Sequence, residues 1–226
     1  MPYLSRIWLN PLRRTTQRYY SDPQTVHAAV LGGIPDQPVT ERILWRLDAI
    51  RAHRTALYVL TQSAPSWEHI VEQAGWPNTS HPQSSIKPYE RITDRLATDQ
   101  QYAFHLCANP VRTVPIATDD PPGKHPRGVR RAHRTAQQQI EWLLDHTKGW
   151  GWDIPVATSG DRDVTIIERR TVHFAKRSGN RVTLDTATFE GRLHVLDPDL
   201  LRHSLLVGVG PAKAYGCGLI TLAPLY

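Results

Sequence analysis

The sequence predicts an α+β fold built from two consecutive β-α-β-β-α-β units, residues 1–90 and 91–226. Three observations support this prediction. Strand and helix patterns recur in the same order in both halves, and the first strand of each half ends at an Asn-Pro pair, Asn10-Pro11 and Asn109-Pro110. Each half also has a helix that begins with an Asp-Pro pair. Two such units in succession form two tandem ferredoxin-like domains.

The first half opens with an alternating strand at residues 3–9, followed by a basic and aromatic stretch at 13–20. A helix is predicted next, because Asp22 is a favoured N-cap, Pro23 fits the first helical position, and apolar residues recur at helical spacing as far as Leu31. Two glycines end this helix. The remaining predicted elements are strands at 42–47 and 56–61, a helix at 66–72 capped by Ser66, and a short strand at 85–87.

The second half has the same order with insertions. Residues 101–108 alternate like a strand, and the stretch from Thr118 to Arg134 is too rich in proline, glycine and charge to pack. Further predicted elements are a helix at 136–144 with Ile140, Leu143 and Leu144 facing inward, strands at 163–167, 171–175, 181–184 and 189–196, a hairpin turn at 176–180, a helix after Asp197-Pro198 with Leu200, Leu201 and Leu205 as its buried stripe, and a final strand at 219–222.

Composition narrows the class of protein. With 40% hydrophobic and 21% charged residues, the chain has the composition of a folded soluble protein. The net charge of +6 suits a polyanionic partner. Cys107 and Cys217 are the only cysteines, which favours a reducing, cytoplasmic setting over a secreted disulfide scaffold. No apolar run approaches the ~20 residues of a membrane span, so we expect no membrane partner.

A glycine-rich loop lies between the last predicted helix and the last predicted strand. It contains Gly208, Gly210, Lys213 and Gly216, and its backbone N–H groups are suited to contact phosphate, with Lys213 adding a point charge. A packing turn without a ligand is the alternative. A dinucleotide fingerprint is disfavoured, because a strand follows where that motif needs a helix.

Basic residues gather in two segments. Arg130 and Arg131 belong to a run in which basic residues are interleaved with histidines and no acidic residue occurs, which suits binding to duplex phosphates. A solvated charged loop is the alternative interpretation. The second segment is the predicted hairpin turn at 176–180, which contains Lys176 and Arg177. From the two segments and the glycine loop, the predicted RNA-binding residues are Lys124, Arg127, Arg130, Arg131, Arg134, Arg177, Gly208, Gly210 and Lys213.

The chain resembles the CasE family, the CRISPR RNA-processing endoribonucleases of type I-E systems. Five motifs carry this resemblance across nearly the whole chain: Gly208-Val209-Gly210-Pro211-Ala212-Lys213, Gly216-Cys217-Gly218-Leu219, Phe189-Glu190-Gly191, Ala108-Asn109-Pro110 and Gln139-Ile140-Glu141-Trp142-Leu143. The resemblance implies a double ferredoxin-like fold that cuts CRISPR repeat RNA at the base of a stem-loop. It also implies that the protein stays bound to the product and contacts other Cascade subunits, especially the adjacent backbone subunit.

The resemblance places the catalytic histidine at His27 and a basic hairpin, Lys176 with Arg177, beside the cleavage point. Because RNA carries its own nucleophile in the 2′-OH, cleavage to a 2′,3′-cyclic phosphate needs only proton transfer and charge stabilisation. A positioned histidine can transfer a proton near neutral pH. We therefore expect no metal and no cofactor, since no carboxylate cluster or His/Cys spacing indicates one.

One residue departs from the family pattern. The family commonly has a tyrosine three positions before the histidine, where this chain has Gln24, which can donate a hydrogen bond but cannot act as an acid or base. Tyr19 and Tyr20 are candidate replacements for the family tyrosine. The alternative is that cleavage does not require a tyrosine hydroxyl. Two other function classes therefore stay open: a non-catalytic RNA-binding subunit of the same fold, and an enzyme that binds a phosphorylated small molecule through the glycine loop.

Overall fold

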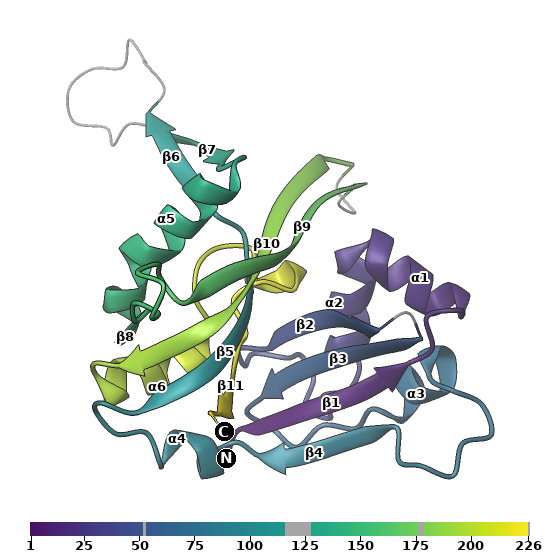
Figure 1. The fold of residues 1–226 in the computed structure, drawn as a ribbon. Coiled ribbons are helices and arrows are strands. Elements are labelled where there is room, and N and C mark those ends of the chain that lie inside the picture. Colours follow the sequence, from purple (N-terminus) through teal and green to yellow (C-terminus); the bar gives the residue numbers. More distant parts are fainter. Residues whose placement is uncertain (52, 116–127, 176–178, 226) are drawn as a thin grey trace.

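A computed structural model describes residues 1–51, 53–115, 128–175 and 179–225. Its described residues form two larger antiparallel sheets and a separate two-stranded hairpin (Figure 1). The first sheet has the strand order β2-β3-β1-β4, and the second has β11-β5-β10-β8 with β9 also paired to β10. Read as β11-β5-β10-β9, the second sheet repeats the order of the first. The predicted tandem ferredoxin-like fold is therefore confirmed.

The first half contains β1 and two helices before its central hairpin. Asp22 is the N-cap of α2, and its side chain accepts a hydrogen bond from the backbone N–H of Gln24, as the sequence predicts. The bounds are β1 Tyr3–Leu9, α1 Arg14–Ser21, α2 Pro23–Leu31, β2 Leu44–Arg51, β3 Arg54–Thr61, α3 Glu68–Ala74, β4 Ser84–Pro88 and α4 Glu90–Thr93.

The second half has longer strands and one additional hairpin. Its last helix begins at Asp197, whose side chain accepts hydrogen bonds from the N–H groups of Asp199 and Leu200. The bounds are β5 Gln101–Ala108, β6 Val111–Pro115, β7 Gly128–Ala132, α5 Ala136–Thr147, η1 Lys148–Trp150, β8 Trp152–Asp153, β9 Val164–Ala175, β10 Arg181–Val195, α6 Pro198–Val207, η2 Lys213–Tyr215 and β11 Ile220–Pro224.

Four local predictions are wrong. Residues 128–132 pair with β6 as a hairpin instead of remaining unpaired, whereas the basic stretch at 13–20, for which no element is predicted, forms the helix α1. The four strands predicted between 163 and 196 are two long strands, β9 and β10. Ser66 does not cap α3, which begins after Trp67 without a side-chain cap. Leu200 is 45% exposed, so Leu201 and Leu205 form the buried stripe of α6.

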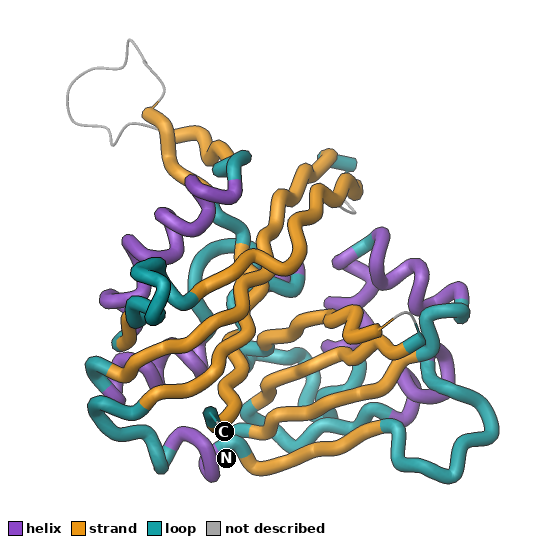
Figure 2. Tube along the Cα trace, viewed as in Figure 1, coloured by secondary structure: helices purple, strands orange, loops and turns teal. Residues whose placement is uncertain are grey.

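Helices cover one face of each sheet (Figure 2). One core lies under α1, α2 and α3 and includes Ile7, Leu9 and Val26. The other lies under α5 and α6, and it also takes in Leu44 and Leu60 from the first sheet. The two halves therefore share apolar packing where the sheets meet, although the predicted division at residue 90 stays a prediction about folding units.

Arg46 joins the two halves through polar contacts. This β2 residue is 2% exposed and forms a two-bond ion pair with Asp48, with distances of 2.7 and 2.9 Å. It also donates to the carbonyl oxygens of His105 and Leu219 and to Thr221 Oγ1, each at 2.9 Å. Burial alone would raise the pKa of Asp48, but the Arg46 guanidinium and His105 outweigh it and hold that pKa well below its usual range.

Candidate nucleic-acid interface and active site

Three segments that are distant in the sequence line one groove of about 1030 Å³. They are the hairpin β6–β7 with the start of α5, the strand β10, and the glycine-rich loop. Four of the lining residues are arginines and one is acidic: Arg112, Arg130, Arg131, Arg134 and Asp185. We call this the arginine groove. Its charge is suited to a polyanion.

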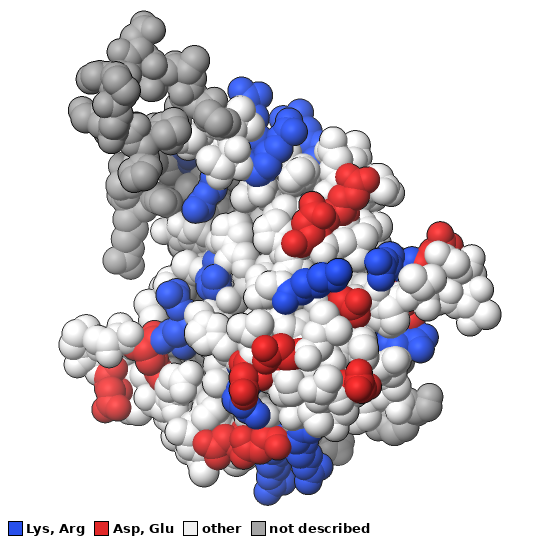
Figure 3. Space-filling view, turned by 90° about the vertical axis from the view of Figure 1, so that its left-hand side faces the viewer, with Lys and Arg blue, Asp and Glu red and all other residues white. Residues whose placement is uncertain are grey.

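The hairpin β6–β7 supplies most of this charge. In its register Arg112 lies opposite Arg131, and Thr113 lies opposite Arg130. Arg130 and Arg131 are both exposed. Like charges directly opposite each other destabilise a sheet. An anion bound between Arg112 and Arg131 would reduce this repulsion. At the height of this hairpin in Figure 1, Figure 3 shows Lys and Arg side chains gathered beside residues drawn in grey.

The arginine groove also reaches the N-terminus of α5. Thr135 caps this helix by accepting a hydrogen bond from the Gln138 backbone N–H, and the Gln138 side chain accepts one from the Thr135 backbone N–H, which completes a capping box. Arg134 directly precedes the cap and its side chain is exposed. Because a helix N-terminus carries partial positive charge, α5 adds to the field of the arginines.

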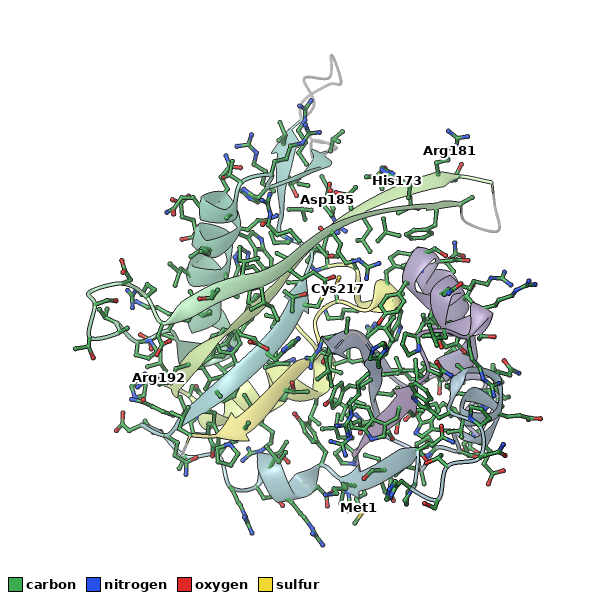
Figure 4. The ribbon with its side chains drawn as sticks, turned by 45° about the vertical axis from the view of Figure 1, so that its right-hand side comes forward. Met1, His173, Arg181, Asp185, Arg192 and Cys217 are labelled. Carbon is green, nitrogen blue, oxygen red and sulfur yellow. The ribbon has the colours of Figure 1, made fainter. Side chains whose placement is uncertain are left out.

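A second hollow of about 560 Å³ lies between the start of α5 and the hairpin β9–β10, which we call the arm. Arg134 lines both hollows, and the guanidinium of Arg169 donates to the Arg134 carbonyl oxygen. Figure 4 shows His173, Arg181 and Asp185 along the arm, which projects beyond the rest of its sheet. Basic side chains therefore continue from the arginine groove onto the arm.

The glycine-rich loop is tightly packed against protein. Gly208 and Gly210 have positive φ angles of 78° and 65°. A Cβ at Gly208 would lie 2.6 Å from Leu44 Cδ2, and one at Gly210 would lie 3.3 Å from Trp142 Cη2. These glycines permit close packing of the loop on both halves. Their predicted contact with phosphate stays a prediction.

Lys213 closes the same loop on itself. Its Nζ donates to the carbonyl oxygen of Gly210 at 2.7 Å. Burial lowers its pKa, and the nearby Arg42 lowers it further. Lys213 therefore has a structural contact in addition to its predicted contact with phosphate.

His27 lies on α2, on the face turned toward the end of the arm. One turn earlier on that face, Gln24 Nε2 donates to the carbonyl oxygen of Ala175, the last residue of β9, at 2.7 Å. The helix α2 also packs beside η2, which ends the glycine-rich loop. Burial lowers the pKa of His27 below its ordinary value of about 6.5. Its Nδ1 is buried without a hydrogen-bond partner among the described residues.

Two candidate tyrosines are already engaged. Tyr19 is 3% exposed and belongs to the core of the first half. The hydroxyl of Tyr20 lies 2.7 Å from Thr55 Oγ1, and Arg170 donates to the Tyr20 carbonyl oxygen at 2.9 Å. Burial raises the pKa of both phenols. Their predicted roles in proton transfer stay predictions.

The structure also brings forward residues that the sequence did not single out. Tyr215 in η2 lines the arginine groove, and its ring packs against Phe174 of the arm at a centroid distance of 5.0 Å. Arg112, Arg169 and Arg170 line the two hollows. A basic residue on a strand next to a charged loop was the available signal for Arg112. Tyr215 had no such signal, since its position depends on how the loop packs.

Several predicted residues lie outside the described part of the chain: Lys124, Arg127, Lys176 and Arg177. Lys176 and Arg177 directly follow Ala175, to which Gln24 is bonded. Among the described residues, no three His, Cys, Asp or Glu side chains gather where they could hold a metal ion. The helices described include none with the length and apolar character that a membrane crossing requires.

The chain is similar to known proteins over most of its length. A family model described as CRISPR associated protein matches residues 2–224. A Thermus thermophilus protein named CRISPR-associated endoribonuclease Cse3 is 28% identical over 232 residues, which cover 98% of this chain and 100% of that protein. An Escherichia coli protein named CRISPR system Cascade subunit CasE is 26% identical over 189 residues, which cover 80% of this chain and 89% of that protein. A solved structure of Thermus thermophilus Cse3 bound to an RNA representing a pre-cleavage complex aligns over 99% of both chains, with 28% identity and a TM-score of 0.77.

Proposed function

The chain belongs to the CRISPR-associated protein family, and from that premise we propose that it is a metal-independent endoribonuclease that cleaves CRISPR repeat RNA at the base of its stem-loop. After cleavage it stays bound to the product as a Cascade subunit in the cytoplasm. The names of two relatives, an endoribonuclease and a Cascade subunit, support this proposal. So does the RNA-bound state of the aligned Cse3 structure.

One observation in this chain carries the proposal. The hydrogen bond from Gln24 to Ala175 fixes the helix of His27 against the end of the arm, and η2 packs beside the same helix while Tyr215 lines the arginine groove. His27, which can transfer protons, therefore lies at the end of the arginine groove, which can bind phosphates. Cleavage within a bound RNA requires this combination.

The mechanism follows from the environment of His27. Because burial lowers its pKa, the imidazole is mostly neutral at pH 7 and can accept the proton of the attacking 2′-OH. The 2′-oxygen attacks the adjacent phosphorus, the P–O5′ bond breaks, and the products are a 2′,3′-cyclic phosphate and a 5′-OH. Lys176, which follows the arm residue bonded to Gln24, stabilises the charge on the phosphate. Tyr20 and Tyr19 are the candidates for the second proton transfer.

The arginine groove binds the stem. The major groove of an A-form duplex is deep and narrow, so the protein recognises the stem mainly by its shape and backbone phosphates. Arg130, Arg131 and Arg134 lie on the hairpin side of the groove, and Gly208, Gly210 and Lys213 lie in the loop on its other side. Lys124, Arg127 and Arg177 extend the same set in sequence.

The test uses the stem-loop repeat RNA from the source genome, incubated with the protein in EDTA. We expect one cut at the base of the stem, a 2′,3′-cyclic phosphate end, and no cut when the nucleotide before the scissile bond carries a 2′-deoxyribose. A cut that needs added divalent metal, or that persists in the 2′-deoxy RNA, contradicts the mechanism. Co-purification of the cleaved stem-loop with Cascade subunits tests the retention of the product.

A non-catalytic RNA-binding subunit is the second candidate function. The observation that favours it is Gln24, whose side chain is committed to the Ala175 carbonyl oxygen and offers no acid or base beside His27. The same experiment separates the two candidates. Tight binding of the stem-loop without any cleavage supports the second candidate and contradicts the first.

A further inference from the structure

Two of the seven tryptophans are not used in either core. Trp45, Trp67, Trp142 and Trp152 are buried members of the two cores, and Trp150 packs against one of them. Trp8 and Trp76 belong to neither core, and both are half-buried. They line one pocket of about 440 Å³ at the end of β1, together with His53, Arg54, Thr79, His81, Pro82 and Gln83. We call this the Trp8 pocket.

Two arginine side chains lie over the Trp8 ring, and one of them, Arg54, also lines the Trp8 pocket. The guanidinium carbon of Arg54 lies 3.9 Å from the centroid of the Trp8 ring, and that of Arg6 lies 4.6 Å away. Neither arginine side chain forms a hydrogen bond or ion pair with another described residue, and the lining contains no acidic residue. Their N–H donors therefore remain available to an anion.

The pocket is also rigidly built. The Gln83 carboxamide bonds to Trp76 at two points: it accepts from the Trp76 backbone N–H and donates to the Trp76 carbonyl oxygen at 2.8 Å. The Trp8 backbone N–H donates to the Gln83 carbonyl oxygen at 2.7 Å. These bonds hold the loop of Trp76 beside the end of β1, where the Trp8–Gln83 bond continues the pairing of β1 with β4. The two indoles are thus positioned without core packing, which is how stable binding sites are preorganised.

We propose that the Trp8 pocket binds one nucleotide of single-stranded RNA, with its base stacked against the Trp76 indole and its phosphate on Arg6 and Arg54, whose guanidiniums lie over the Trp8 ring. Flat aromatic surfaces beside free cations are the features by which proteins bind single strands without sequence preference. The volume of about 440 Å³ suits one base. In Figure 1 the end of β1 lies on the opposite side of the molecule from β6–β7. This inference rests on the proposed function, and the inferred ligand is therefore the unpaired RNA that flanks the stem-loop.

Binding of two sets of RNA tests the proposal. One set is the stem-loop alone, and the other carries unpaired flanks of increasing length on the 5′ or the 3′ side. In the wild type we expect a flank beyond a threshold length to tighten binding. Trp76→Ala should abolish this gain, a loss between about fivefold and a hundredfold, because alanine substitution of a stacking residue has effects of that size. Binding and cleavage of the stem-loop alone should be unchanged.

Further variants keep the test independent of folding. Trp8→Ala, which removes the ring beneath both guanidiniums, and the pair Arg6→Gln with Arg54→Gln should lose the same gain. Thermal melting identifies any variant that is unfolded. Trp150→Ala, at a partly buried tryptophan that packs against the second core, is the matched control and should retain the gain. An ultraviolet cross-link from an unstructured oligouridine should map to the peptides that contain Trp8 or Trp76.

Equal binding of flanked and unflanked RNA by the wild type overturns the inference, as does an equal loss for both RNAs in Trp8→Ala. If a polyglutamate peptide protects Trp8 and oligouridine does not, the pocket is a protein-docking site and the inference is wrong. These outcomes differ from failure of the proposed function. In that case the stem-loop is not cut at all, while the effect of a flank on binding can still be measured.

Discussion

The two halves use the same strand order for different purposes, and the difference is largest in their central hairpins. In the first half, β2 and β3 have 8 residues each and do not project beyond their sheet. In the second half, β9 and β10 have 12 and 15 residues, and the arm they form reaches α2 of the first half. The first half supplies the histidine, and the second supplies most of the arginines. The longer hairpin therefore places the end of the second sheet beside the helix of His27, which the proposed function requires.

Replacing His27 with alanine tests the role of the first half and should have the largest effect. Cleavage in a single turnover should slow by about 10²–10⁴-fold, the typical contribution of a general acid or base. Affinity for the stem-loop should stay near that of the wild type, because the arginines are unchanged. His203→Ala, at an exposed position on α6, is the control. Cleavage at the wild-type rate by His27→Ala would show that the first half does not supply the chemistry.

Reversing Arg130 and Arg131 to glutamate tests the role of the second half. Two lost phosphate contacts should reduce the salt dependence of binding by about 0.7–0.9 each in the slope of log K against log salt. Arg91→Glu with Arg95→Glu changes the net charge equally at exposed sites near α4. Titration of RNA binding at several salt concentrations measures both pairs. An identical slope in the two double variants would mean that β6–β7 does not contact phosphate.

Gly210→Ala probes the loop that packs on both halves. Its φ of 65° and the 3.3 Å approach to Trp142 predict a loss of about 1–3 kcal/mol in the free energy of unfolding. Gly160→Ala is the matched control, because Gly160 has a φ of 91° but open space around it. Chemical denaturation gives the stabilities, and RNA titration gives the affinities. Lost affinity at unchanged stability in Gly210→Ala would support a phosphate-contacting role over a packing role.

Lys213 lies in the same loop. If its side chain were free in solvent, Lys213→Ala would leave the free energy of unfolding unchanged. Because Lys213 Nζ bonds to the Gly210 carbonyl oxygen, Lys213→Ala should instead lower stability as well.

The pH dependence of cleavage sharpens the assignment of His27. A lowered pKa means that the imidazole stays neutral until the pH falls below its ordinary value of about 6.5. If His27 acts as the base, the rate should be constant above that pH and should fall with acidification at an inflection below 6.5. Single-turnover rates between about pH 4.5 and 8.5, two units to either side of an ordinary histidine pKa, measure it. A rate that rises on acidification would contradict the role of base.

Tyr20→Phe should have the smallest effect. Loss of the 2.7 Å contact with Thr55 should reduce the free energy of unfolding by about 0.5–1.5 kcal/mol. If the Tyr20 hydroxyl also takes part in proton transfer, the cleavage rate should fall as well. Tyr19→Phe, at a position in the core, serves as the comparison. Normal cleavage by both variants would exclude both hydroxyls from the mechanism, and Tyr215→Phe would then be the next test.

Much of the fold could be predicted because its signals are local. The Asp22-Pro23 and Asp197-Pro198 caps depend on neighbouring residues, and the helices begin where the sequence predicts. The hairpin β6–β7 was missed because its strands are separated by a long polar segment, and pairing across such a segment leaves no short-range pattern. The arm was divided into pieces because charged residues interrupt the alternation of a strand that is mostly exposed.

The candidate site was predictable only in part for the same reason. Arg130, Arg131 and Arg134 are adjacent in the sequence, and they line one groove. The position of His27 came from the resemblance, since one histidine on a helix has no pattern of its own. The contact of Gln24 with Ala175 spans 151 residues, and the place of Tyr215 depends on loop packing. Neither could be read from residues close together in the chain.

Arg46 makes the two halves one cooperative unit. Its guanidinium spans from Asp48 to two backbone carbonyls and a hydroxyl of the other half, so separating the halves would expose a charged group with its partners removed. A molecule in this state has no low-energy hinge between its halves, and heat should unfold it in one transition instead of two. We therefore expect the two larger sheets to keep their relative positions when the proposed RNA ligand binds.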